Sequence, residues 1–148
     1  MDLKMKGFQT NKQSIYIDCK QLLRRLYRLR FKVAKRHRDS LFDKCLFPAL
    51  LGMIRHFRRA YRFRDERVKE LDEFLFSFED FNSWVDVASE EKVINDKEYA
   101  SLFEYIVRIY ESVNAYRNSA RKARSSAGSN DDGASENKDD SRGGDGFI

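Results

Sequence analysis

The chain has 148 residues, enough for one domain, and its net charge of +5 hides a sorting of charge along the sequence. Residues 1–64 hold 18 lysines and arginines against 4 acids, residues 65–124 hold 9 against 14, and residues 125–148 hold 2 against 6. Before residue 125 the breakers are Gly7, Gly52 and Pro48, too few for a strand-rich fold, and no apolar run approaches the ~18 residues of a membrane span. The N-terminus also lacks the apolar region of a secretory signal, so we expect a cytoplasmic protein without membrane contact.

The first predicted element is a helix over residues 14–36, preceded by a flexible N-terminus over residues 1–13. Ser14 suits the cap of this helix. Apolar residues follow with alternating spacings of four and three, which is typical of a helix that buries one face. These residues are Ile15, Cys19, Leu22, Leu26, Leu29 and Val33. The two cysteines, Cys19 and Cys45, lie at apolar positions and are interpreted as small buried side chains in a reducing compartment.

A second helix is predicted from a cap at Asp39 or Ser40 to about residue 63. Pro48 lies inside its apolar pattern. Because proline lacks a backbone N–H and clashes with the preceding turn, we expect a kink or a restart near residues 47–48.

Two further helices complete the predicted fold. Asp65 and Glu66 suit the start of the third, whose core face is aromatic and is expected to include Trp84 and Phe78. Asn95 or Asp96 caps the fourth, which is expected to bury Phe103 and Tyr110 among its apolar residues and to run to about residue 122. Residues 125–148 are almost devoid of apolar side chains and are predicted to be disordered. The prediction is an all-α fold: an up-down-up-down four-helix bundle over residues 14–124 with a disordered acidic C-terminal tail.

The candidate functional site is basic. Lysine or arginine recurs every fourth residue from Lys20 to Arg36, which predicts one exposed ridge, and no acid occurs between Lys20 and Arg38. Arginine forks match the geometry of phosphate groups, so this pattern favours binding of nucleic-acid backbones with little sequence readout. The predicted nucleic-acid-binding residues are Lys20, Arg24, Arg25, Arg28, Lys32, Lys35, Arg36, Arg38, Arg55, Arg58, Arg59 and Arg62.

Other interpretations of the basic residues stay open. They form either a solubilising face or a surface for an acidic protein partner. Among the interleaved aromatic residues, most are expected in the core, and Tyr27 and Phe63 are the better candidates for stacking on unpaired bases. Acids of the third helix, Glu66, Glu70, Glu73 and Asp80, are candidates for pairing with the basic helices of a second copy of the chain, and pairing within the same chain is an equally open alternative.

Catalysis has little support in the sequence. Arg30 and His37 match the loose R-x4-6-H pattern of helical HEPN ribonucleases, although that family places it in a late helix. No carboxylate cluster with metal spacing, glycine-rich phosphate loop or paired nucleophile and base is evident. We therefore expect a protein that is not an enzyme, with no cofactor and no metal.

The order and lengths of the predicted helices, the basic corner FKVAKRHR at residues 31–38, the sequence RRAY at residues 58–61 and the opening INDKEY at residues 94–99 provide a family resemblance. The chain resembles the four-helix-bundle superfamily of ribosomal-RNA intervening-sequence proteins and of the accessory (Avd) proteins of diversity-generating retroelements. Pro48 and the phenylalanine-rich third helix depart from its pattern. The resemblance implies a pentameric homo-oligomer that binds nucleic acid, RNA or DNA, and a retroelement reverse transcriptase in mutagenic copying of template RNA.

Overall fold

A computed structural model describes residues 10–135, and all regular structure in this range is helical, which confirms the predicted fold class. The long helices are α2 (Thr10–Arg30), α4 (Phe47–Arg62), α5 (Arg67–Glu90) and α6 (Asp96–Ser135). Three short elements, α3 (Lys35–His37), the π-helix η1 (Arg38–Leu46) and the 3-10 turn η2 (Arg64–Glu66), lie between them. The chain divides into two compact units after Arg117.

Helix α2 ends at Arg30, six residues before the predicted end at residue 36. Tight turns follow, in which the N–H of Phe31 donates to the carbonyl of Arg28 (3.2 Å) and that of Lys32 to Leu29 (2.9 Å). A continued helix would have stacked Arg28, Lys32 and Arg36 as like charges four residues apart, which is unfavourable. At its other end α2 already includes residues 10–13, which had been predicted to be flexible; residues 1–9 lie outside the described range.

The second predicted helix is built in three pieces. It begins at Lys35 in α3, so the predicted caps Asp39 and Ser40 are wrong, because both lie within the helical segment. The nine residues of η1 then follow the wider π spacing, and the N–H of Phe47 donates to the carbonyl of Phe42, five residues back. Regular α4 starts at Phe47, with Pro48 in its first turn, where a missing N–H costs little. The restart predicted near residues 47–48 is confirmed.

Helix α6 begins after Asn95, one of the two predicted caps, and the cap is reciprocal. The N–H of Glu98 donates to the side-chain oxygen of Asn95 (2.8 Å), and the N–H of Asn95 donates to the carboxylate of Glu98 (2.9 Å). This capping box satisfies two backbone donors that a helix start leaves open.

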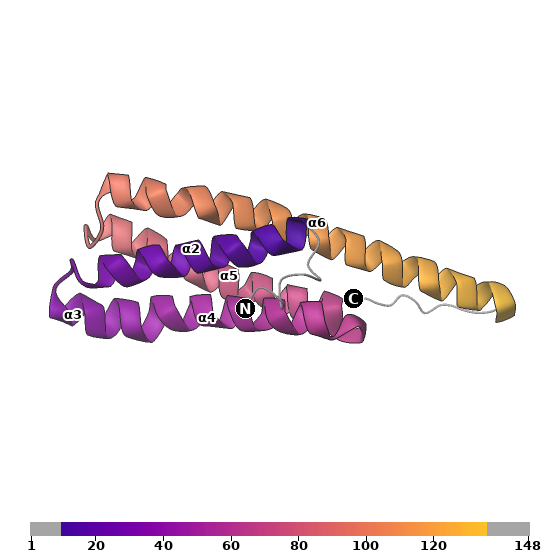
Figure 1. Cartoon of the computed structure of the whole chain (residues 1–148). Coiled ribbons are helices and arrows are strands. Elements are labelled where there is room, and N and C mark those ends of the chain that lie inside the picture. The colour runs from indigo at the N-terminus through magenta and orange to yellow at the C-terminus, as the bar shows by residue number, and fades with distance from the viewer. Residues whose placement is uncertain (1–9, 136–148) are drawn as a thin grey trace. The chain divides into compact units, whose positions relative to one another are not determined.

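The long helices of the first unit pack through one apolar core. Consecutive long helices run in opposite directions, as Figure 1 shows. Each contributes residues at the predicted spacing of three and four, so α2 buries Ile15, Leu22 and Leu26, and α6 buries Leu102 and Ile109. The largest fully buried side chains from the other two helices and η1 are Phe42, Leu46, Leu50, Met53, Phe57, Leu71, Phe74 and Phe81.

Some predicted core positions are on the surface instead. Trp84 is 37% exposed, Phe103 46% and Tyr110 50%. Helices α5 and α6 carry apolar residues around much of their circumference, so spacing alone could not decide which of them face inward. Tyr110 still stacks on Phe78 of α5, with ring centroids 5.7 Å apart.

A buried carboxylate joins α4 to α5. Glu70 of α5 is only 5% exposed, and its two oxygens contact His56 Nδ1 (2.8 Å) and the Nε of Arg59 (3.0 Å) on α4. Burial raises the pKa of Glu70, but the hydrogen bonds from His56 and Arg59 lower it more, so the net pKa lies below its ordinary value of 4.5. A paired, charged Glu70 therefore stabilises the contact between the two helices at neutral pH.

The second unit, described as far as Ser135, continues α6 beyond the predicted end near residue 122. Residues 125–135 are helical, which differs from the predicted disordered tail over this stretch. Residues 125–135 are mostly Ser, Gly, Asn and Asp, which are weak helix formers, and nothing in the sequence explains the helix over this stretch. The rest of the predicted tail, residues 136–148, lies outside the described residues.

Replacing Glu70→Ala should lower the free energy of unfolding by about 1–3 kcal/mol at pH 7, because His56 and Arg59 lose their partner. Since the folded-state pKa is lowered, the contribution of Glu70 is complete above its ordinary pKa and is lost as pH falls through the folded-state value. Denaturant unfolding between pH 7 and pH 3 should show the wild type and the variant converging in acid. A difference in stability that stays constant over this range would contradict the assignment.

Candidate nucleic-acid interface

Basic and aromatic side chains alternate along the side of α2 that faces away from the core. At about 100° per residue, positions 17, 20, 24, 27, 28 and 31 fall on one side of a helix, opposite the buried residues. We call this set the α2 outer face: Ile17, Lys20, Arg24, Tyr27 and Arg28 of α2, and Phe31, which directly follows its last residue; all of them are exposed. No acid belongs to it, so Lys20, Arg24 and Arg28 are three cations on an unbroken strip of surface.

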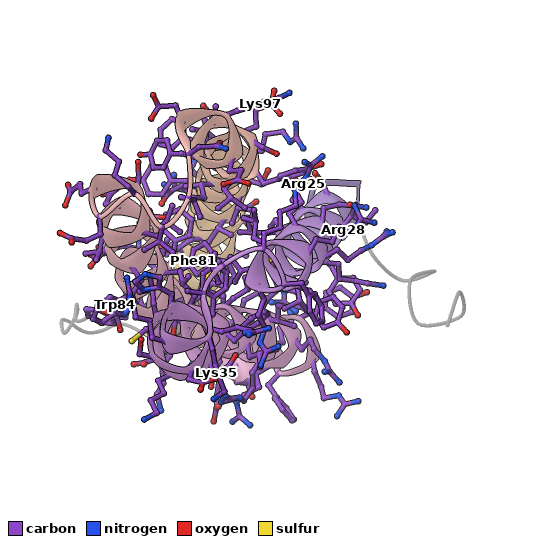
Figure 2. The ribbon with its side chains drawn as sticks, turned by 90° about the vertical axis from the view of Figure 1, so that its left-hand side faces the viewer. Arg25, Arg28, Lys35, Phe81, Trp84 and Lys97 are labelled. Carbon is purple, nitrogen blue, oxygen red and sulfur yellow. The ribbon has the colours of Figure 1, made fainter. Side chains whose placement is uncertain are left out.

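A polar seam between α2 and α6 sets this orientation. Asp18, 6% exposed, accepts two hydrogen bonds from Arg108 of α6 (3.3 and 3.4 Å), so the acid of this segment points away from the outer face. Arg25 donates to the hydroxyl of Ser101 (2.5 Å) and lies over the ring of Tyr105, 5.2 Å from its centroid. Figure 2 shows Arg25 on the side of α2 that faces α6, whereas Arg28 points outward.

Two aromatic rings lie among these cations. Tyr27 and Phe31 are each 57% exposed and meet edge to face, with centroids 5.0 Å apart and an interplanar angle of 87°. The guanidinium of Arg30 lies 5.9 Å from the Phe31 centroid. Phe63, the other ring expected to stack on bases, is 43% exposed at the end of α4.

The predicted continuous ridge from Lys20 to Arg36 is wrong, because α2 ends at Arg30 and Arg36 belongs to α3. Lys32 is exposed in the connection between them. Beyond it, Lys35 is held by Asp39 (2.6 Å), and the Nε of Arg36 donates to the ring of His37 (3.4 Å). The corner between α2 and α4 is therefore less cationic than its sequence indicates.

Other basic residues at this corner also pair with acids. Arg30 makes two hydrogen bonds to Asp43 of η1, at 2.8 and 2.9 Å. This pairing holds the pKa of Asp43 below its ordinary value and raises that of Arg30. Arg38 adds an electrostatic attraction to the same carboxylate. Arg30 and His37, the pair that matches the ribonuclease pattern, thus each have a partner of their own.

A second group of cations lies on α4. Arg55, Arg58 and Arg62 are exposed, whereas Arg59 is held by Glu70 (3.0 Å) and contacts Glu66 (3.7 Å). The 16 residues of α4 span about 24 Å, so Arg62 at its end is far along the helix axis from Lys35 and Arg36. An open hollow of about 350 Å³ adjoins this end, lined by Arg59, Arg62, Phe63, Arg64, Asp65 and Glu66.

The structure thus separates the predicted site residues by their partners. Arg25, Lys35, Arg36 and Arg59 contact groups within the chain. Arg38 is attracted to the carboxylate of Asp43, and Lys20 lies over the ring of Tyr16, at 5.4 Å from its centroid. The remaining members have no hydrogen bond or ion pair to a described residue and are available to an external anion. They are Arg24, Arg28, Lys32, Arg55, Arg58 and Arg62.

The acids expected to pair with a second copy are also divided. Glu66 and Glu70 contact Arg59 of the same chain, whereas Glu73 and Asp80 are exposed on α5. Pairing within the chain had been an equally open alternative, and the structure shows it for the first two acids.

Sequence reasoning missed the seam between α2 and α6. Asp18 and Arg108 are 90 residues apart, and Arg25 and Ser101 are 76 apart, so no local spacing connects them. It also ranked Tyr27 above Phe31 as a candidate for stacking on bases. The signal that would have found Phe31 is its position four residues after Tyr27, which puts both rings on one side of the helix.

Among residues 10–135, no group of three or more histidines, cysteines, aspartates or glutamates is arranged to hold a metal ion. Within the same range, no helix combines the length and apolar character needed to cross a bilayer. Cys19 is buried, and burial raises the pKa of its thiol.

No protein-family model matches the chain, and no curated protein matches it in sequence. The resemblance to the superfamily of intervening-sequence and Avd proteins therefore stays a prediction that rests on the sequence features described above.

Adjacent arginines of α2 should respond differently to mutation. Arg25→Ala should lower the free energy of unfolding by about 1 kcal/mol, because it removes contacts to Ser101 and Tyr105, whereas Arg24→Ala should change it by less than about 0.5 kcal/mol. Chemical denaturation of the two variants measures this. Equal losses would show that the outer face and the seam are assigned to the wrong arginines.

Proposed function

We propose that this protein is a non-enzymatic nucleic-acid-binding accessory protein that contacts phosphate groups through the α2 outer face. The observation that carries the proposal is the strip of exposed cations at Lys20, Arg24 and Arg28, with no acid among them and no partner for Arg24 and Arg28 among residues 10–135. Like charges four residues apart cost stability, so such a strip favours a function that needs it. Backbone phosphates match this spacing of charge without any requirement for base sequence.

The exposed arginines of α4 support a second contact. Arg55, Arg58 and Arg62 are exposed and have no hydrogen bond or ion pair within the described part of the chain, and Phe63 follows Arg62 at the end of the helix. A polyanion longer than a single phosphate group can engage both sets. Lys32 and Arg38, at the connection between the two helical segments, are additional cations for such a strand.

The finer proposal is an Avd-like role. Residues 14–124 would form an up-down-up-down four-helix bundle that assembles as a homo-oligomer, a pentamer by resemblance, and binds both template RNA and a retroelement reverse transcriptase. The helix order, the short connections and the basic surface of α2 and α4 support it. Co-purification with a reverse transcriptase encoded beside this gene, lost on mutation of the basic residues, is the experiment that tests this role.

The competing proposal is that the same cations bind an acidic protein. It differs in its specificity, because a protein partner needs a matched surface whereas a phosphate backbone needs only spacing of charge. A pure oligonucleotide that binds the isolated chain favours nucleic acid. A chain that binds no oligonucleotide favours the acidic protein.

The double variant Arg24→Ala/Arg28→Ala should bind RNA roughly 10- to 100-fold more weakly at ~0.1 M salt, and its salt dependence should be shallower, because two phosphate contacts are lost. Fluorescence anisotropy across a salt series measures both effects. The matched control removes two exposed lysines from α5 and α6, Lys69→Ala/Lys97→Ala, with the same change in net charge. Equal losses in both variants would reduce the effect to overall charge and would contradict a site on α2.

A further inference from the structure

The exposed aromatic pair on the α2 outer face has no role in binding phosphates. Tyr27 and Phe31 each leave 57% of their surface in solvent, a larger fraction than any other large hydrophobic side chain of the described part except Phe76. An aromatic ring that stays in water forgoes the stabilisation that burial would provide. Other rings, such as Phe42 and Phe57, fill the core, so the rings of Tyr27 and Phe31 remain available to a ligand.

The rings alternate with cations over a short length of helix. Arg24 and Arg28 are four residues apart in α2, an interval of about 6 Å along the helix axis, and the rings of Tyr27 and Phe31 lie 5.0 Å apart at the end of the same helix. Arg24 and Arg28 have no partner among the described residues. A ligand along this strip therefore meets flat apolar surfaces and positive charges in alternation.

Unpaired nucleotides have this combination of groups. A single strand exposes the faces of its bases, which stack on aromatic side chains, and carries one phosphate for each base. In a duplex the base faces are covered by neighbouring pairs, so only the phosphates remain for the protein. An acidic peptide would supply the charge without the flat rings, and a lipid surface would not alternate in this way.

We infer that Tyr27 and Phe31 form a stacking platform for unpaired bases, flanked by Arg24 and Arg28 as phosphate contacts, so that the α2 outer face prefers single-stranded nucleic acid to duplex. This inference rests on the proposed function and specifies its substrate class. Since the bases are held by their faces, the platform discriminates weakly between sequences.

The test compares three probes of about 12 nucleotides: an oligouridylate, an RNA duplex and an abasic strand that keeps the phosphates. The double variant Tyr27→Ala/Phe31→Ala should bind the oligouridylate roughly tenfold more weakly or worse, and should bind the duplex and the abasic strand within about twofold of wild type. Tyr27→Phe, which keeps the ring, should retain wild-type affinity for the oligouridylate. The control Phe76→Ala/Phe103→Ala removes two exposed rings from α5 and α6 and should change nothing.

Each result has one meaning. Salt-sensitive binding of all three probes that the Tyr27/Phe31 variant leaves unchanged would overturn the platform while the proposed function stands. Equal weakening for the oligouridylate and the duplex would also overturn it, because the rings would then act through the fold of α2. An absence of salt-sensitive binding to any probe by wild type would instead remove the proposed function itself.

Discussion

The ion pair between Asp18 and Arg108 is the contact on which the surface of this protein depends. A helix can bury its apolar stripe over a range of rotations, but a carboxylate that is 6% exposed and bound by two guanidinium nitrogens fixes α2 against α6. Arg25 strengthens the same seam through Ser101 and the ring of Tyr105. With α2 fixed in this way, Lys20, Arg24, Tyr27 and Arg28 face the solvent together.

Basic residues of the first 64 therefore divide into those that build the fold and those that remain for a ligand. Arg25, Arg30 and Arg59 join α2 to α6, α2 to η1, and α4 to α5, each through hydrogen bonds to another element. Arg24 and Arg28, next to them in sequence, bind nothing described within the chain. Net charge alone overstated the number of cations available to a ligand, because acids of the same chain, such as Asp43 and Glu70, pair with some of them.

The fold followed from the sequence where the signal was local. The spacing of Ile15, Cys19 and Leu22 placed the buried side of α2, Pro48 placed the restart of α4, and Asn95 placed the start of α6. The candidate site was predictable only in part, because partners such as Ser101 and Arg108 lie far along the chain. The exposure of Trp84 and Tyr110 was missed for a related reason: a helix that is apolar on several sides does not reveal which side the neighbours cover.

The most direct test of the account is to locate the contact itself. Ultraviolet cross-linking of the full chain to a single-stranded RNA, followed by mass spectrometry of the peptides, identifies which residues touch the nucleic acid. The account predicts adducts on α2 between Lys20 and Phe31, with Tyr27 and Phe31 as the principal positions. Adducts confined to the exposed rings of α5 and α6, such as Phe76 and Phe103, with none on α2, would contradict it.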